Sequence, residues 1–268
     1  MLTGFINRNI FKLAEKTSGI IEFQENAEIY PENDKAEKQQ SDSTIPEVDQ
    51  GVPNEIEFSD SLFSESYVIK DFPIIYQMPE LPTGCEITAL TMVLNYYGFS
   101  ADKVQMATQY LPTLPSAGAF LGEDGRLYGN DMKQYFIGNP QTDDGIICGT
   151  GAIISAVTSF SAETGNYVQA VDRTGISLEE LYQLISEDTP VMVLCTIGME
   201  DRNVRQGWYT ENGEYVDWAS NDHGTVLIGY SPDTVTIADP ISGLVEYSRT
   251  QFESVFHSRG SRCVILQK

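Results

Sequence analysis

The spacing of apolar and polar residues changes sharply at about residue 67. Residues 22–65 hold thirteen acidic residues, two lysines and few aliphatic side chains, and three prolines interrupt any regular period. A segment of this composition cannot bury enough apolar surface to form its own core. We therefore expect residues 1–66 to be an acidic, flexible N-terminal arm or linker, and residues 67–268 to form one folded domain. A propeptide-like segment lying across the domain is the alternative for the acidic part.

A short amphipathic pattern precedes the acidic segment. In residues 1–20, apolar side chains recur at helical spacing with basic side chains beside them. The pattern predicts a short helix, and peripheral membrane contact by this segment is an alternative that it permits. No stretch of the chain approaches the roughly 20 apolar residues needed to span a bilayer. Residues 1–20 also lack the continuous apolar core of a signal peptide.

The first strongly apolar helix is expected at residues 85–97. Residues 68–76 have the composition of a strand entering a turn, and two prolines exclude a regular helix in residues 77–84. From Cys85 onward, apolar side chains occupy several helical faces, which predicts a helix buried nearly all round. Gly98 is a typical helix stop.

Toward the C-terminus the period changes from helical to strand-like. Residues 177–180 form a capping box, Ser-Leu-Glu-Glu, which predicts the start of another helix. Strand-forming runs then occupy residues 191–197, 224–230, 234–238, 244–247 and 263–266. Helices followed by antiparallel strands predict an α+β fold, in which N-terminal helices pack on a C-terminal antiparallel β-sheet.

Charge and cysteine usage narrow the function classes. The formal net charge of −23 at pH 7 repels nucleic acid, so we expect no nucleic-acid partner. The four cysteines are widely separated and form no Cys-x-x-Cys pair. This spacing argues against both a zinc site and a disulfide framework.

Cys85 is the candidate nucleophile. It is expected at a helix N-terminus directly after Gly84, where unpaired N–H groups and the helix dipole favour a thiolate. The alternative is a small core residue at the start of a helix. Cys148, Cys195 and Cys263 follow or lie within apolar runs, so they are expected to be buried and unreactive.

His223 is the candidate base, because the chain has only two histidines. It opens an apolar run after a polar segment, and a titratable residue at the mouth of an apolar strand is well placed to face the edge of a cleft. His257 is instead expected on the surface, at the end of a helix.

Asp239 is the candidate that orients the imidazole of His223. A hairpin with a three-residue loop at 231–233 would pair Tyr230 with Thr234 and place Asp239 diagonal to His223 on the same face. A two-residue loop would reverse that face. Asp222 is a poorer candidate, because neighbouring strand residues point to opposite faces. Asp239 could alternatively be a turn residue before a proline.

Gln77 completes the candidate set. It lies on the irregular segment before the expected helix, where its amide could stabilise an oxyanion together with the backbone N–H of Cys85. Glutamine is also common on exposed surfaces, so the residue alone is a weak signal.

Three segments carry a family resemblance: residues 76–90 around Cys85, residues 222–230 with 238–240, and residues 136–140. Together they resemble the papain-like cysteine peptidases that include the bacteriocin-processing, double-glycine leader peptidases, in particular the stand-alone bacterial branch. The resemblance covers residues 70–268 and implies a papain-like fold. It also implies that Cys85 is the nucleophile, His223 the general base and acid, Asp239 the orienting residue and Gln77 the oxyanion donor.

The resemblance implies hydrolysis of a peptide or protein substrate, with no metal and no organic cofactor, in the bacterial cell envelope or outside the cell. No transporter domain accompanies these segments, so processing of leader peptides coupled to export is not implied. Two alternatives stay open: acyl transfer or amidase action on the same scaffold, and a catalytically silent peptide-binding module. The sequence indicates neither the cleavage motif nor the oligomeric state.

Overall fold

The described part of the chain is built around one antiparallel β-sheet of seven strands. The structure is a computed structural model, and it describes residues 65–268. Along the sheet the order is β12–β11–β10–β7–β13–β6, with β1 paired to β10, and every pairing is antiparallel. The strands are β1 (Tyr67–Val68), β6 (Gln169–Asp172), β7 (Val191–Thr196), β10 (Asp222–Tyr230), β11 (Thr234–Asp239), β12 (Gly243–Ser248) and β13 (Cys263–Gln267). The expected arm, apart from its last two residues, and the amphipathic segment at 1–20 lie outside the described residues.

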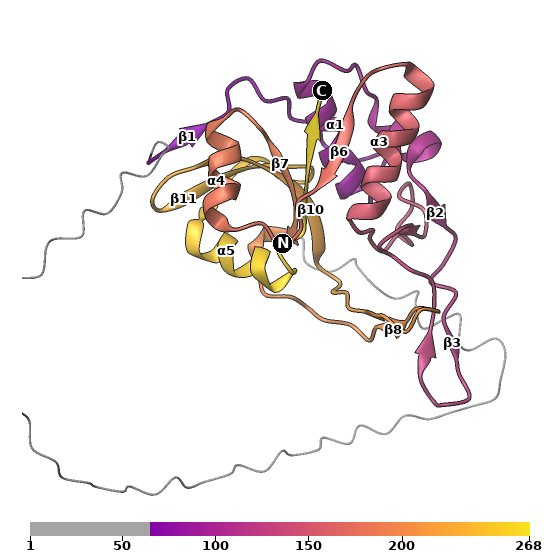
Figure 1. Ribbon diagram of the computed structural model, residues 1–268. Coiled ribbons are helices and arrows are strands. Elements are labelled where there is room, and N and C mark those ends of the chain that lie inside the picture. Colours follow the sequence, from indigo (N-terminus) through magenta and orange to yellow (C-terminus); the bar gives the residue numbers. More distant parts are fainter. Residues whose placement is uncertain (1–64) are drawn as a thin grey trace, which may run out of the picture. The chain divides into compact units, whose positions relative to one another are not determined.

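Four helices of nine or more residues cover this sheet among the described residues: α1 (Cys85–Tyr96), α3 (Thr150–Thr164), α4 (Leu178–Ser186) and α5 (Arg249–Ser258). Helix α1 packs on β10 and β7, and α3 packs on β6 and β13. Figure 1 shows α1 and α3 on one side of the sheet and α4 and α5 on the other. The mixed arrangement confirms the predicted α+β class, although α4 and α5 are interleaved with strands along the chain.

Helix α1 is the buried helix that the sequence predicts. Its first ten residues are all buried, and they place Cys85 at the first helical position. Gly98 follows with a φ of 86°, a left-handed conformation that glycine adopts without steric cost. The strand expected at residues 68–76 is wrong beyond Val68, because Asp71 turns the chain with a φ of 53°.

The hairpin of β10 and β11 differs from the predicted one near its loop. Tyr230 pairs with Val235 rather than Thr234, so the loop has four residues. A β-bulge between Leu227 and Gly229 then adds one residue to β10. Beyond the bulge, Val226 pairs with Ala238, as the predicted register requires. The longer loop and the bulge compensate for each other, so the open end of the hairpin has the predicted register.

A second, smaller core lies beside shorter elements. It is built from six buried side chains: Met132, Ile137, Ile147, Trp208, Val216 and Trp218. A four-stranded sheet borders it, made of β3 (Phe120–Leu121), β4 (Leu127–Tyr128), β8 (Trp208–Tyr209) and β9 (Tyr215–Val216). The parallel pair β2 (Thr113–Leu114) and β5 (Phe136–Ile137) also contributes to this core. The short helix α2 (Lys103–Gln105) and a π-helical turn (Met106–Tyr110) instead contact α1, and a 3₁₀ turn (Ile197–Met199) contacts α5. Strands of two residues have no readable period, so the sequence does not predict them.

Candidate active site

Cys85 occupies the position that the sequence predicts, at the N-terminus of α1. Gly84 precedes it as the N-cap, and a Cβ at Gly84 would lie 2.9 Å from the Cβ of Leu81. Only glycine therefore allows the chain to enter the helix at this point. At the first helical position, the N–H of Cys85 needs no partner within the helix. This N–H is available to an incoming oxyanion.

The thiol of Cys85 is buried against a carboxyl group. The residue is 8% exposed, and its sulfur donates to Oε2 of Glu86 at 3.2 Å. Burial, followed by the charge of Glu86, raises the pKa of the Cys85 thiol well above its ordinary value, while an N–H of Gly224 acts in the opposite direction.

His223 and Asp239 lie together, as the open end of the hairpin requires. Nε2 of His223 is 3.1 Å from Oδ1 of Asp239, and both side chains are buried. The same oxygen accepts the backbone N–H groups of Ile241 at 2.6 Å and Ser242 at 3.1 Å. Burial alone would raise the pKa of Asp239, but these bonds and the histidine lower it overall. The carboxylate is thus fixed as an acceptor beneath the imidazole.

The other ring nitrogen of His223 has no hydrogen-bond partner among the described residues. This atom, Nδ1, is buried. The next residue, Gly224, directs its backbone N–H at the Cys85 sulfur, so strand β10 brings His223 close to the N-terminus of α1. No hydrogen bond joins thiol and imidazole in the described structure. Catalytic hydrogen bonds are often long before substrate binds.

Gln77 lies between these two parts of the site. Its backbone N–H donates to the carbonyl of Pro240 at 2.9 Å, beside Asp239. Its side chain is buried, and Nε2 donates to the carbonyl of Pro82 at 2.8 Å. An amide has two N–H donors, so one remains for another acceptor. The weak sequence signal thus belongs to a buried, anchored side chain.

Asp222 does not contact the imidazole, in agreement with the sequence argument. Its carboxylate lies 3.1 Å from Nε of Arg259 and 3.4 Å from Nε of Arg202, and it accepts the N–H of Ala219. Burial lowers the pKa of Arg259 to about 10, although the charge of Asp222 raises it. This buried ion cluster closes the start of β10 next to His223.

The other predicted cysteine and histidine environments are confirmed. Cys148, Cys195 and Cys263 are buried. Burial raises the pKa of the Cys195 and Cys263 thiols to about 12. His257 lies exposed in the last turn of α5.

Glu86 is the residue near the thiol that the sequence analysis missed. It is 1% exposed, and its two oxygens accept from Cys85 and from the backbone N–H of Cys148. A signal was present in the sequence: an acidic residue stands inside a helix predicted to be buried on nearly every face. Such a carboxyl has to be buried as well, and burial of an unpaired charge is costly.

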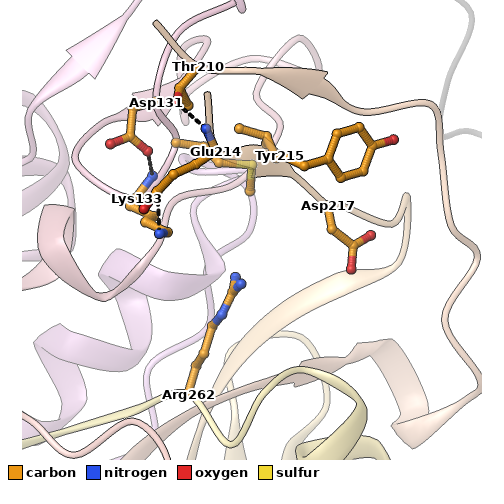
Figure 2. A pocket seen from close by; sticks show the side chains of 9 residues that line it. Asp131, Lys133, Thr210, Glu214, Tyr215, Asp217 and Arg262 are labelled. Atoms are coloured by element: carbon orange, nitrogen blue, oxygen red, sulfur yellow. Dashed lines mark hydrogen bonds and ion pairs between the residues drawn. The ribbon is translucent and has the colours of Figure 1, made fainter. Parts of the chain in front are cut away.

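A small cavity lies away from all four candidate residues. Figure 2 shows its lining, in which Lys133 and Glu214 form an ion pair and Arg262 points toward the same space. Its volume is about 20 Å³, which is close to that of one water molecule. It is too small for a peptide side chain.

Residues 65–268 contain neither a metal-binding cluster nor a membrane-spanning helix. No group of three or more His, Cys, Asp or Glu side chains there could hold a metal ion. No helix in the same residues is both long and apolar enough to cross a membrane.

Comparisons with known proteins agree with this architecture. Residues 69–264 match the model of the "Peptidase_C39 like family". The chain is 29% identical over 191 residues to the uncharacterized protein YvpB of Bacillus subtilis, a match that covers 71% of each chain. It is also similar to a solved structure from Bacillus anthracis, described as that of a candidate C39-like peptidase. The identity is 30% and the TM-score 0.65, over 76% of this chain and 98% of the other.

Proposed function

Since the chain belongs to the C39-like peptidase family, we propose that it is a cysteine peptidase that uses Cys85, His223 and Asp239. The observation that supports this assignment best is the buried contact of 3.1 Å between His223 and Asp239. It occupies Nε2 and leaves Nδ1 without a partner among the described residues, on the strand that packs against the Cys85 helix. An oriented imidazole with one vacant nitrogen near a thiol is the arrangement that nucleophilic catalysis needs.

The reaction begins with transfer of the Cys85 proton to Nδ1 of His223. The thiolate attacks the carbonyl carbon of the scissile bond, and the carbonyl oxygen becomes an oxyanion. The backbone N–H of Cys85 and the second N–H of the Gln77 amide would donate to this oxygen. Asp239 holds the ring and stabilises the imidazolium that forms.

Collapse of the intermediate breaks the C–N bond. Nδ1 of His223 returns its proton to the leaving amine, which departs and leaves a thioester on Cys85. Water then gives up a proton to the same nitrogen and attacks the thioester. Collapse of this second intermediate breaks the C–S bond and releases the acid product, and Nδ1 of His223 returns its proton to the Cys85 thiolate. Every proton is carried by residues of this chain, and the proposed substrate is a peptide or protein.

Cleavage of a peptide library by the whole chain tests this proposal. We expect the parent protein to cleave a subset of peptides and Cys85→Ala to cleave none, because the variant has no nucleophile. Cys263→Ala is the matched control, since it removes a buried thiol that the mechanism does not use. Cleavage by Cys85→Ala at the parent rate would disprove the assignment, and aminolysis products in place of acids would show acyl transfer.

A further inference from the structure

Glu86 is a buried carboxyl group held against the proposed nucleophile. One oxygen accepts the Cys85 thiol at 3.2 Å, and the other accepts the backbone N–H of Cys148 at 3.4 Å. A Cβ on Gly224 would lie 2.8 Å from Cγ of Glu86, so strand β10 packs directly on this side chain. The absence of a side chain at residue 224 leaves room for the carboxyl beside the thiol.

Three titratable groups face Glu86 among the described residues. They are Cys85 on α1, Cys148 on the segment before α3, and His223 on β10. Neither a lysine nor an arginine in residues 65–268 forms an ion pair with it. Burial raises the pKa of Glu86 above its ordinary value of 4.5, although its hydrogen bonds and His223 act in the opposite direction. The carboxyl therefore takes up a proton more readily than an exposed glutamate.

The two protonation states of Glu86 act differently on the thiol. An ionised carboxylate accepts the S–H of Cys85 and repels a thiolate at the same position. A protonated carboxyl carries no charge, and its O–H can donate to a thiolate instead. The bond seen here, from thiol to carboxylate, therefore opposes transfer of the proton to His223.

We propose that Glu86 is a positioning residue that restrains Cys85 in its resting state and releases it when Glu86 takes up a proton. This inference rests on the proposed role of Cys85 as nucleophile. One proton from solvent converts the carboxylate to the acid, and the thiol then turns from Oε2 toward Nδ1 of His223. Proton transfer from sulfur to that nitrogen gives the thiolate and imidazolium. The site is thus more reactive under mildly acidic conditions than its histidine alone would make it.

Glu86→Gln is the variant that imitates the protonated state. The amide oxygen can accept the N–H of Cys148, and the amide N–H₂ can donate to a thiolate at Cys85. The side chain keeps its shape, so the packing of Gly224 is preserved. A change seen in this variant therefore reports the lost charge and not a cavity.

The test is the alkylation rate of Cys85 by iodoacetamide, followed residue by residue by peptide mass spectrometry across pH. Near and below the ordinary glutamate pKa, parent and variant carry the same charge, so we expect their rates to agree. At neutral pH we expect Glu86→Gln to react on the order of tenfold faster, since one unit of thiol pKa changes the thiolate fraction tenfold.

Glu179→Gln is the matched control, because Glu179 is exposed on α4. Its rate ratio to the parent should stay near one at every pH. A ratio for Glu86→Gln that does not vary with pH would overturn the proposal, and so would slower labelling at neutral pH. Should the variant not fold, the pH profile of the parent's alkylation rate decides. If Glu86 restrains the thiol, this rate should rise less steeply with pH as Glu86 ionises. An uninterrupted tenfold rise per pH unit would contradict the proposal.

These outcomes are independent of peptidase activity. If no peptide is cleaved but the rate ratio rises with pH, the proposed function fails and the restraint stands. If Cys85-dependent cleavage is found and the ratio is flat, the peptidase assignment stands and the restraint fails.

Discussion

The buried imidazole of His223 is held by one carboxylate oxygen of Asp239. The carboxylate binds Nε2 of the imidazole together with the backbone N–H groups of Ile241 and Ser242, all through Oδ1. Those backbone groups hold the oxygen in place, so the ring is oriented before substrate binds. Orientation of this kind is a large part of what an enzyme contributes to a reaction.

Asp239→Asn isolates the charge of this pair. The amide oxygen can still accept all three donors, so the geometry should survive while the stabilisation of the imidazolium is lost. We expect kcat/KM to fall by on the order of tenfold or more, and the acid limb of the pH profile, where the base is lost to protonation, to move to lower pH. Steady-state rates on a cleaved library peptide provide the measurement. An unchanged rate and profile would exclude Asp239 from the mechanism.

The same variant has a predicted effect on stability. The pKa of Asp239 is lowered below its ordinary value of 3.8, so its carboxylate favours the folded state above that pH, and this contribution is lost as pH falls through the folded-state pKa. Parent and Asp239→Asn should therefore differ most at neutral pH and converge in acid, as followed by urea unfolding.

At the scale of elements, the helices with the strongest sequence patterns were the ones that could be predicted. Helix α1 has ten buried residues in succession, and α4 has a complete capping box, so both were expected. Helix α3 begins after Gly149 without a side-chain cap, and no start signal marked it. The loop between β10 and β11 is one residue longer than predicted, and the bulge in β10 restores the predicted pairing beyond it. No local motif marks such a bulge, so the alignment of His223 with Asp239 could be expected but not its cause.

Helix α4 provides a test of the capping prediction. Ser177 accepts the N–H of Glu180 at 3.2 Å, and Glu180 accepts from Ser177 in return. Ser177→Ala should lower the free energy of unfolding by about 0.5–2 kcal/mol without changing turnover, because the helix N-terminus lies apart from the site. Ser248→Ala is the control, since its contact with Gln251 is longer, at 3.5 Å. An equal or larger loss in the control would contradict this account.

At the scale of the molecule, the main core and its seven-stranded antiparallel sheet bring distant segments together. Gln77, Cys85, His223 and Asp239 span more than half of the chain, and the contacts of α1 with β10 and of Gln77 with Pro240 link their segments. The residue types could be read from the sequence, and the family resemblance indicated their roles. Burial of the thiol against Glu86 could not be read from the sequence, because it depends on how α1 packs against β10.

Covalent labelling by a substrate-like electrophile tests the central claim most directly. A peptide with a cleaved library sequence, carrying a chloromethyl ketone at the scissile carbonyl, would be incubated with the whole chain and the adduct located by mass spectrometry. We predict one adduct per chain, on the sulfur of Cys85, with slower labelling in His223→Ala. An adduct on another cysteine, or equal rates with and without His223, would contradict the proposed mechanism.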